Sequence, residues 1–140
     1  MKKAANADII VMSAAVADFT PKNVASKKIK KGEADLSKVE LVPTKDILLE
    51  LGKKKSKKQI LVGFALETDH EEENAKKKIK NKNLDLIVLN SLQNKGAGFK
   101  TDTNKISIID RHNKITRYEL KPKSEVAADI AEKIILLLKD

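Results

Sequence analysis

One carboxylate and a short group of lysines are the residues whose types and spacing could do chemistry in this chain. Asp18 follows a run of small residues, and the basic segment after it contains Lys27, Lys28, Lys30 and Lys31. A carboxylate can face a metal ion or a sugar hydroxyl, while lysines neutralise phosphate oxygens. The combination predicts a site for a polyphosphate and its metal ion. The alternatives are that Asp18 is a helix N-cap or turn residue and that the lysines form a solvated loop.

An apolar segment, Ile9–Met12, has to position this site. Its branched side chains are typical of a strand that is buried on both faces. Ser13 and Ala14 follow it, and such small residues let another molecule approach the backbone. Open α/β sheets bind ligands where buried strands end, so the position of Asp18 favours a ligand site. A buried strand this early has no preceding element to pair with, so we expect the chain to be the later part of a longer domain.

The remaining pattern predicts an α/β fold. It is a Rossmann-like, mostly parallel sheet flanked by helices, with a C-terminal β-hairpin and a final helix, and it forms a single domain over residues 1–140. The pattern predicts a strand at 38–42, followed by a short helix that is capped by Thr44 and ends near Gly52. Strands at 59–65 and 84–90 are expected on either side of a helix at 70–82, and a hairpin is expected from 105–110 and 115–120. The last expected element is a helix capped by Ser124, with the apolar stripe Val126, Ile130, Ile134 and Leu137. Gly63 is expected to allow close approach of a ligand. The loops at 20–31 and 91–104 are expected to be mobile without a ligand.

Composition excludes several classes of site. The chain has no cysteine, which excludes disulfides and thiolate zinc sites. Its two histidines, His70 and His112, lie in separate polar stretches, which argues against a histidine metal site. No apolar run approaches the roughly 20 residues that span a bilayer, and the N-terminus lacks the apolar block of a signal peptide. We therefore expect a cytoplasmic protein with no membrane partner.

The net charge of +9 raises the alternative of a basic nucleic-acid-binding domain. Only four residues are aromatic, Phe19, Phe64, Phe99 and Tyr118, so stacking platforms for single strands are scarce. Many lysines are also interleaved with acids on predicted helix faces. The charge is compatible with anionic ligands, and a nucleic-acid partner is not favoured.

Segment ends near Asp46, Phe64 and Asn90 complete the set of candidate site residues. Phe64 could cover a base or fill the core, and Lys78 and Lys82 share a helix face that the pattern alone assigns to solvent. The chain shows no serine–histidine–acid set, metal cluster or paired catalytic carboxylates. One carboxylate, several lysines and backbone amides fit nucleotide binding, and they also fit phosphoryl or nucleotidyl transfer.

At these residues the chain resembles the phosphopantothenate–cysteine ligase family of coenzyme A biosynthesis, often the second half of a bifunctional protein with a flavin-dependent decarboxylase. The matching motifs are AAVADF at 14–19, KIKK at 28–31, Asp46-Ile47 opening a helix, VGFALET at 62–68, NLDLIVLN at 83–90 and GFKTDTN at 98–104. Their order and spacing agree over almost the whole chain.

The resemblance implies a reaction in two steps. CTP activates the carboxylate of 4′-phosphopantothenate as an acyl-cytidylate and releases pyrophosphate, and the amine of cysteine then displaces CMP. Magnesium (Mg2+) is required, and the bacterial type is a homodimer.

The resemblance also implies the roles of individual residues. Lys28 would hold the triphosphate and stabilise charge during acyl transfer, and Asp18 would bind the nucleotide or its metal. The rest of the nucleotide site would be formed by the backbone around Met12, Ser13 and Ala14, by the helix start at Lys45, Asp46, Ile47 and Leu48, and by Phe64, Lys78 and Lys82.

One feature of the family is absent from the sequence. Members begin with a glycine-rich strand–loop–helix that carries part of the phosphate site and an asparagine tied to the acyl-cytidylate step. We therefore expect this chain to need a separate N-terminal portion or decarboxylase domain as a partner. The alternative within the same fold is a non-catalytic nucleotide-binding or assembly fragment.

Overall fold

The computed structural model describes residues 4–30, 38–67, 69–91 and 101–139. The chain forms two compact units, which are described separately. The first unit combines Met1–Ser13 with Leu48–Asp140, and the second is Ala14–Ile47. The predicted loop at 91–104 and the end of the predicted loop at 20–31 lie largely outside the described residues.

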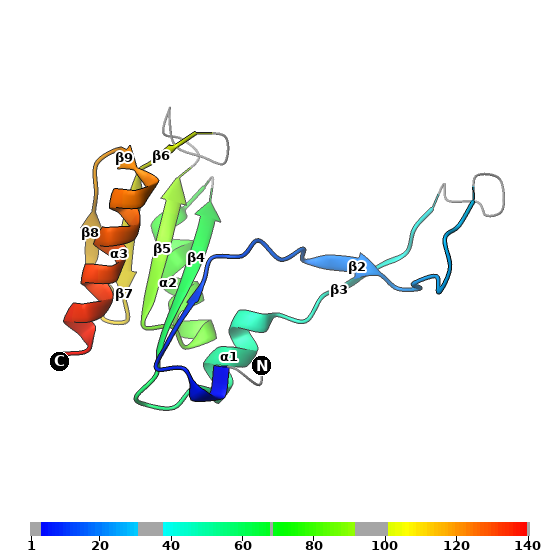
Figure 1. Cartoon of the computed structure of the whole chain (residues 1–140), viewed down its shortest axis with the longest axis horizontal. Coiled ribbons are helices and arrows are strands. Elements are labelled where there is room, and N and C mark those ends of the chain that lie inside the picture. The colour runs from blue at the N-terminus through cyan, green and yellow to red at the C-terminus, as the bar shows by residue number, and fades with distance from the viewer. Residues whose placement is uncertain (1–3, 31–37, 68, 92–100, 140) are drawn as a thin grey trace. The chain divides into compact units, whose positions relative to one another are not determined.

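A mixed sheet is the centre of the first unit (Figure 1). Its order is β1-β4-β5-β7-β8, in which β1–β4 and β4–β5 are parallel and β5–β7 and β7–β8 are antiparallel. The strands are β1 (Ile9–Met12), β4 (Ile60–Glu67), β5 (Leu86–Ser91), β7 (Ile106–Asp110) and β8 (Ile115–Arg117). The predicted α/β class and C-terminal hairpin are confirmed.

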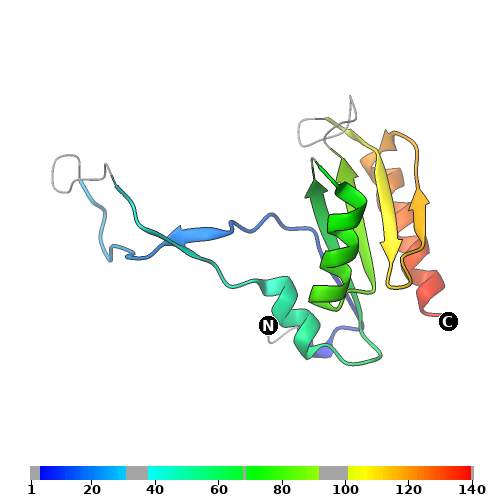
Figure 2. The same ribbon diagram turned by 180° about the vertical axis from the view of Figure 1, so that it is seen from behind.

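Helices cover both faces of this sheet, as Figures 1 and 2 show from opposite sides. They are the single 3-10 turn η1 (Ala4–Asn6), α1 (Ile47–Lys54), α2 (Glu71–Lys82) and α3 (Lys123–Leu137). On one face, Ala75 and Ile79 of α2 pack with Leu61 and Ile87 of the strands. On the other, α3 packs Val126, Ile130 and Ile134 against the strands, with Leu137 partly buried beside them. The predicted apolar stripe of the last helix is confirmed.

The first strand differs from its prediction. β1 was expected to be buried on both faces, but it forms an edge of the described sheet and pairs only with β4. Ile9 and Val11 are 39% and 45% exposed, while Ile10 and Met12 pack against the core. A run of branched residues indicates burial on both faces, but each face is buried only where another layer packs on it. Ile10 and Met12 pack against the cluster that includes α2, whereas the cluster that α3 forms with the strands includes no β1 residue.

Two predicted helix caps are wrong. Thr44 does not cap α1, because its hydroxyl donates a hydrogen bond to the Ala17 carbonyl and α1 begins at Ile47. Ser124 lies inside α3, which begins at Lys123 after Pro122. Pro122 lacks a capping side chain, but proline before a helix start holds the backbone extended. Thr44 is used in the bond to Ala17, and Pro122 precedes the first residue of α3, so neither predicted residue caps its helix.

Two glycines allow close packing of the helices in this unit. A Cβ on Gly52 would lie 1.8 Å from the Lys82 carbonyl oxygen, so α1 meets the end of α2 through a position without a side chain. A Cβ on Gly63 would lie 2.9 Å from methyl groups of Leu48 and Leu84. The side chains of Leu48 and Leu84 therefore occupy the space at Gly63 where a ligand was expected to approach.

A buried carboxylate ties three segments of the sheet together. Asp85 Oδ2 accepts hydrogen bonds from Lys55 Nζ and, at 2.7 Å, from the Leu61 backbone N–H. Asp85 Oδ1 lies 3.5 Å from Arg111 Nη1, and the Asp85 carbonyl accepts a bond from the Arg111 N–H. The start of β5 is thus joined to the segment before β4 and to the turn after β7.

A small antiparallel pair, β6 (Thr103–Asn104) and β9 (Lys121–Pro122), joins the start of β7 to the start of α3. Lys121 Nζ lies 2.8 Å from Asp129 Oδ2. This hydrogen bond raises the pKa of the Lys121 ammonium, although desolvation acts against it. The pairing was not predicted, because two-residue strands carry no periodic pattern.

The second unit is a two-stranded antiparallel ribbon. β2 (Phe19–Pro21) pairs with β3 (Leu41–Pro43), and Lys22 is ion-paired with Glu40 at 2.7 Å beyond their ends. The strand predicted at 38–42 is therefore shifted toward Pro43. The ribbon carries several exposed apolar side chains, namely Val16, Phe19, Val24, Ile29, Val39 and Leu41.

Candidate functional site

The carboxyl ends of the parallel strands form the edge where the sequence places the nucleotide backbone contacts. β1 ends at Met12, which is in register with Gly63 of β4. Ser13 follows directly and is exposed. Met12 and Leu48 both pack against the core on the α2 face of the sheet. The structure therefore brings Met12 and Leu48 together around Gly63.

The helix after β4 carries two of the predicted lysines. Lys78 Nζ is hydrogen-bonded to Glu67 Oε1, the carboxylate of the last residue of β4. This pair places a cationic side chain of α2 at the carboxyl edge of the sheet. Lys82 is the last residue of α2 and is half-buried.

Phe64 lies on the opposite face of β4. It is half-buried and packs against the core cluster that α3 forms with the strands. Met12, Leu48 and Gly63 lie on the α2 face, so the Phe64 ring points away from them because successive side chains of a strand alternate. Phe64 fills core in this structure, and a contact with a base remains a proposal.

The other predicted residues belong to the ribbon unit. Asp18 is exposed and precedes β2, and its carbonyl accepts a hydrogen bond of 2.8 Å from the Thr44 N–H. Ala14, Lys45, Asp46 and Ile47 are also exposed in this unit. The structure therefore brings Asp18 beside the segment that leads into α1.

Lys28 lies after β2, in an exposed segment outside the helices and strands. Within the described ranges no carboxylate pairs with its ammonium group, so it is available to an anionic ligand. Strand β2 separates it along the chain from Asp18, and no described contact joins the two side chains. Lys31, the last lysine of the basic run, lies outside the described residues.

Two further polar groups lie at the carboxyl edge, and only one of them, Asn90, is among the candidates predicted from the sequence. Glu67 is the partner of Lys78, and the signal for it was a carboxylate at a strand end preceding a basic helix. Asn90 was noted only as a segment end. The residue is half-buried, but its side-chain oxygen is buried and has no hydrogen-bond partner in the described structure, whereas a buried polar atom normally has one.

Comparison with known protein families identifies the domain. Residues 1–137 match the model for the DNA/pantothenate metabolism flavoprotein C-terminal domain. The chain belongs to this family. The match spans both units, and it agrees with the ligase family that the sequence motifs indicate.

The relatives that the chain matches are longer than the chain itself. It is 47% identical over 132 residues to the coenzyme A biosynthesis bifunctional protein CoaBC of Bacillus subtilis (strain 168), covering 94% of this chain and 32% of that protein. It is 58% identical over 131 residues to a cysteine/cysteine sulfinic acid decarboxylase of an unknown prokaryotic organism, covering 94% and 36%. The chain thus spans about a third of the length of these relatives.

A solved structure supports the same relation. The C-terminal domain of a coenzyme A biosynthesis bifunctional protein CoaBC matches with a TM-score of 0.78 and 37% identity, covering 99% of this chain and 61% of that one.

Among the described helices, none combines the length and the apolar character that crossing a bilayer requires.

Proposed function

We propose that this chain is the nucleotide-binding portion of a phosphopantothenate–cysteine ligase. The observation that carries the proposal is the family match over residues 1–137, together with close relatives named for coenzyme A biosynthesis. In the first step a carboxylate oxygen of 4′-phosphopantothenate attacks the α-phosphorus of CTP, and pyrophosphate leaves. In the second, the cysteine amine attacks the acyl carbon, and CMP leaves with the bonding electrons.

The proposed roles follow the chemistry of each side chain. Lys28, exposed and without a carboxylate partner in the described structure, holds the triphosphate and stabilises the charge that develops during acyl transfer. Lys78 reaches the phosphates from α2 once it exchanges Glu67 for the ligand. The rest of the site consists of the backbone at Met12, Ser13 and Ala14, the helix start at Lys45, Asp46, Ile47 and Leu48, and the side chains Phe64 and Lys82.

Magnesium fits this donor set as an ion shared with the substrate. Within the described ranges no group of three acidic or histidine side chains gathers as a metal site. Mg2+ commonly uses one or two carboxylates together with substrate phosphates and water. Asp18 is an exposed carboxylate that could supply the protein ligand. The metal would neutralise charge on the phosphates, while Asp18 fixes its position.

The proposal includes a separate N-terminal portion. β1 exposes Ile9 and Val11 at an edge of the described sheet, and its outer backbone groups have no strand beside them there. Exposed apolar edge strands are templates for pairing with further strands. We propose that the portion found in the longer relatives, whether a ligase segment or a decarboxylase domain, completes the sheet at this edge.

Nucleotide binding is tested by calorimetry with CTP and ATP, each with and without magnesium. We expect magnesium-dependent binding of CTP that exceeds that of ATP and that is lost in Asp18→Asn. Glu125→Gln, which makes the same charge change at an exposed position of α3, is the matched control and should bind normally. Equal binding of both nucleotides would contradict CTP selectivity. Binding of any polyanion with a steep salt slope would instead favour a nucleic-acid function.

Pyrophosphate release then separates a ligase from a non-catalytic fragment. It is measured with 4′-phosphopantothenate, CTP and magnesium, with and without the N-terminal portion of a CoaBC relative. We expect little turnover by the chain alone and restored turnover with the supplied portion. Binding without turnover in both cases would indicate a nucleotide-binding or assembly fragment.

The ribbon unit is the proposed contact for a homodimer. A two-stranded ribbon is at best marginally stable alone in water. Phe19 and Leu41 are 58% and 55% exposed on it, so a second copy could bury them. We expect sedimentation velocity to show a dimer for the natural chain and a monomer for Phe19→Asp. Asn23→Asp adds the same charge to the unit and should remain dimeric. A dimer that survives Phe19→Asp would contradict this contact.

A further inference from the structure

A basic cavity lies in the sheet unit, and none of the residues that line it belongs to the proposed nucleotide site. It has a volume of about 660 Å³. It is lined by the C-terminal half of α2, the residues that enter β5 and the turn between β7 and β8, namely Lys76, Lys77, Ile79, Lys80, Asn83, Leu84, Arg111 and Asn113. These elements meet where β5 begins and β7 ends. The cavity is therefore at the edge of the sheet opposite to Glu67 and the other carboxyl ends of the parallel strands.

The charge in this cavity is all of one sign. Three lysines and one arginine line it, and no lining residue is acidic. Arg111 is 3.5 Å from Asp85, and Lys77 is 2.8 Å from Glu73, but both acids lie outside the lining. Lys76 and Lys80 have no carboxylate partner among the described residues. Lys76 and Lys80 are four residues apart on α2 and repel each other, so a bound anion would reduce this repulsion.

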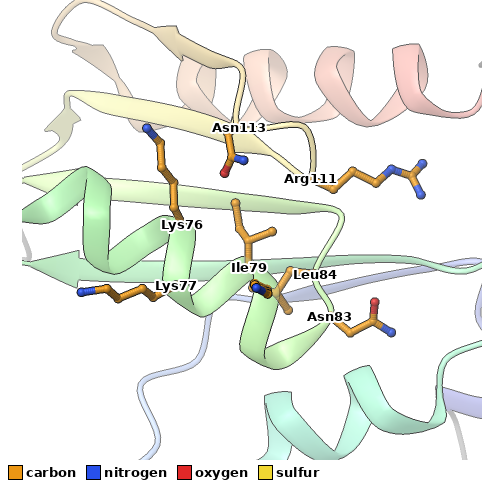
Figure 3. Close-up of a pocket in the computed structure, with 8 residues that line it drawn as sticks. Lys76, Lys77, Ile79, Asn83, Leu84, Arg111 and Asn113 are labelled. Atoms are coloured by element: carbon orange, nitrogen blue, oxygen red, sulfur yellow. The ribbon is translucent and has the colours of Figure 1, made fainter.

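Polar amides and an apolar floor accompany the cations. Ile79 and Leu84 are buried and form the floor, while Asn83 and Asn113 border it. Asn83 already donates its amide hydrogen to the Gly52 carbonyl at 2.8 Å, so it is fixed in place. Figure 3 shows Lys76 and Lys77 reaching from α2, and Arg111 extending from the turn after β7, on either side of Ile79 and Leu84.

We propose that this cavity binds a small organic phosphate that carries at least two negative charges. Lysine and arginine groups at separate parts of the cavity suit two anionic groups, and the asparagine amides add neutral donors. The apolar floor suits the organic part of the ligand, as in most small-molecule sites. The site is distinct from the proposed nucleotide site, and the inference does not rest on the proposed ligase activity.

The test is a titration of the isotopically labelled chain, followed by the backbone amide signals in NMR spectra. Fructose 1,6-bisphosphate serves as the organic probe and inorganic pyrophosphate as the probe of charge alone. We expect saturable shifts confined to residues 76–84 and 111–114 with the bisphosphate, and weaker binding of pyrophosphate. Lys78 and Lys82 of the proposed nucleotide site also lie in α2, so the shifts at residues 111–114, which belong to the cavity alone, separate the two sites and let the two proposals fail independently.

Two matched variants give the test its control. Lys76→Glu/Lys80→Glu should weaken the bisphosphate by about tenfold or more, because each change replaces an attraction with a repulsion. Lys123→Glu/Lys139→Glu makes the same change in net charge at the first residue of α3 and just beyond its last residue, and should change affinity by less than about twofold. Lys76→Gln/Lys80→Gln removes charge without adding acid to the last turns of α2, and circular dichroism checks that each variant is folded.

Three outcomes would overturn the proposal. The first is the absence of saturable shifts at these residues with the bisphosphate. The second is equal weakening in the two glutamate variants, which would indicate a general ion atmosphere. The third is stronger binding of a short DNA duplex at the same residues, which would make the cavity part of a nucleic-acid surface.

Discussion

Lys28→Ala should lower the rate of pyrophosphate release by about 10²–10³-fold when the N-terminal portion is supplied, because it removes a cation placed for the transition state. The loss is expected mainly in kcat. Lys28 is exposed and has no carboxylate partner in the described structure, so its removal should leave the stability of the chain unchanged. The measurement is steady-state kinetics with CTP, magnesium, 4′-phosphopantothenate and cysteine.

Two companion variants sharpen this result. Lys28→Arg keeps the charge and should retain more activity than Lys28→Ala, although a guanidinium differs in shape from an ammonium. Lys58→Ala removes the same charge from an exposed linker position and should have natural kinetics. A Lys28→Ala enzyme whose kcat is unchanged would show that this lysine contributes at most to binding.

Asp85→Ala should destabilise the sheet unit by about 3–5 kcal/mol, because it leaves a buried cation without its partner. The Asp85 and Lys55 side chains are only 5% and 9% exposed. The same carboxylate also accepts a hydrogen bond from the Leu61 N–H, which would lose its partner. Urea unfolding followed by circular dichroism measures the free energy of unfolding.

A double-mutant cycle with Lys55→Met separates the ion pair from the backbone bond. If the unpaired cation causes most of the loss, Lys55→Met/Asp85→Ala should be more stable than Asp85→Ala alone. Glu73→Ala breaks the exposed pair with Lys77 and should leave the unfolding curve unchanged, because surface pairs contribute little. A loss below about 1 kcal/mol for Asp85→Ala would mean that water replaces the buried pair at little cost.

Local pattern was sufficient for the central part of the fold. The strand–helix–strand unit predicted over residues 59–90 matches β4, α2 and β5 closely, because apolar runs bounded by polar residues mark buried strands. The parallel pairing of β4 with β5 is confirmed. The same logic located β1 correctly at Ile9–Met12 but wrongly predicted that both of its faces are buried, since the sequence of a strand leaves open which elements lie beside it.

Interactions between distant residues could not be predicted. Lys55 carries no local signal of a buried role, yet it pairs with Asp85 across 30 positions of the chain. Gly63 suggested ligand approach, whereas Leu48 and Leu84 occupy the space above it. These outcomes depend on which elements pack together. The local pattern of a single sequence does not record which elements pack together.

The candidate site shows the same limit. Motifs identified individual residues, and the structure brings Met12 near Leu48 and joins Lys78 to Glu67. Asp18 and Lys28 belong to the ribbon unit and are linked to each other by no described contact. Apolar side chains of that unit such as Phe19 and Leu41 are exposed, so we expect a ligand or partner to order its residues further.

The ribbon has a consequence for how this domain can diversify. Ala14–Ile47 is one continuous insertion between β1 and α1, and its internal hydrogen bonds are separate from those of the sheet. A change in its length or side chains can therefore alter binding and assembly while the hydrogen bonds of the sheet stay intact. Mutations in the lysine-bearing segment can therefore change the function of the domain while the sheet unit stays folded.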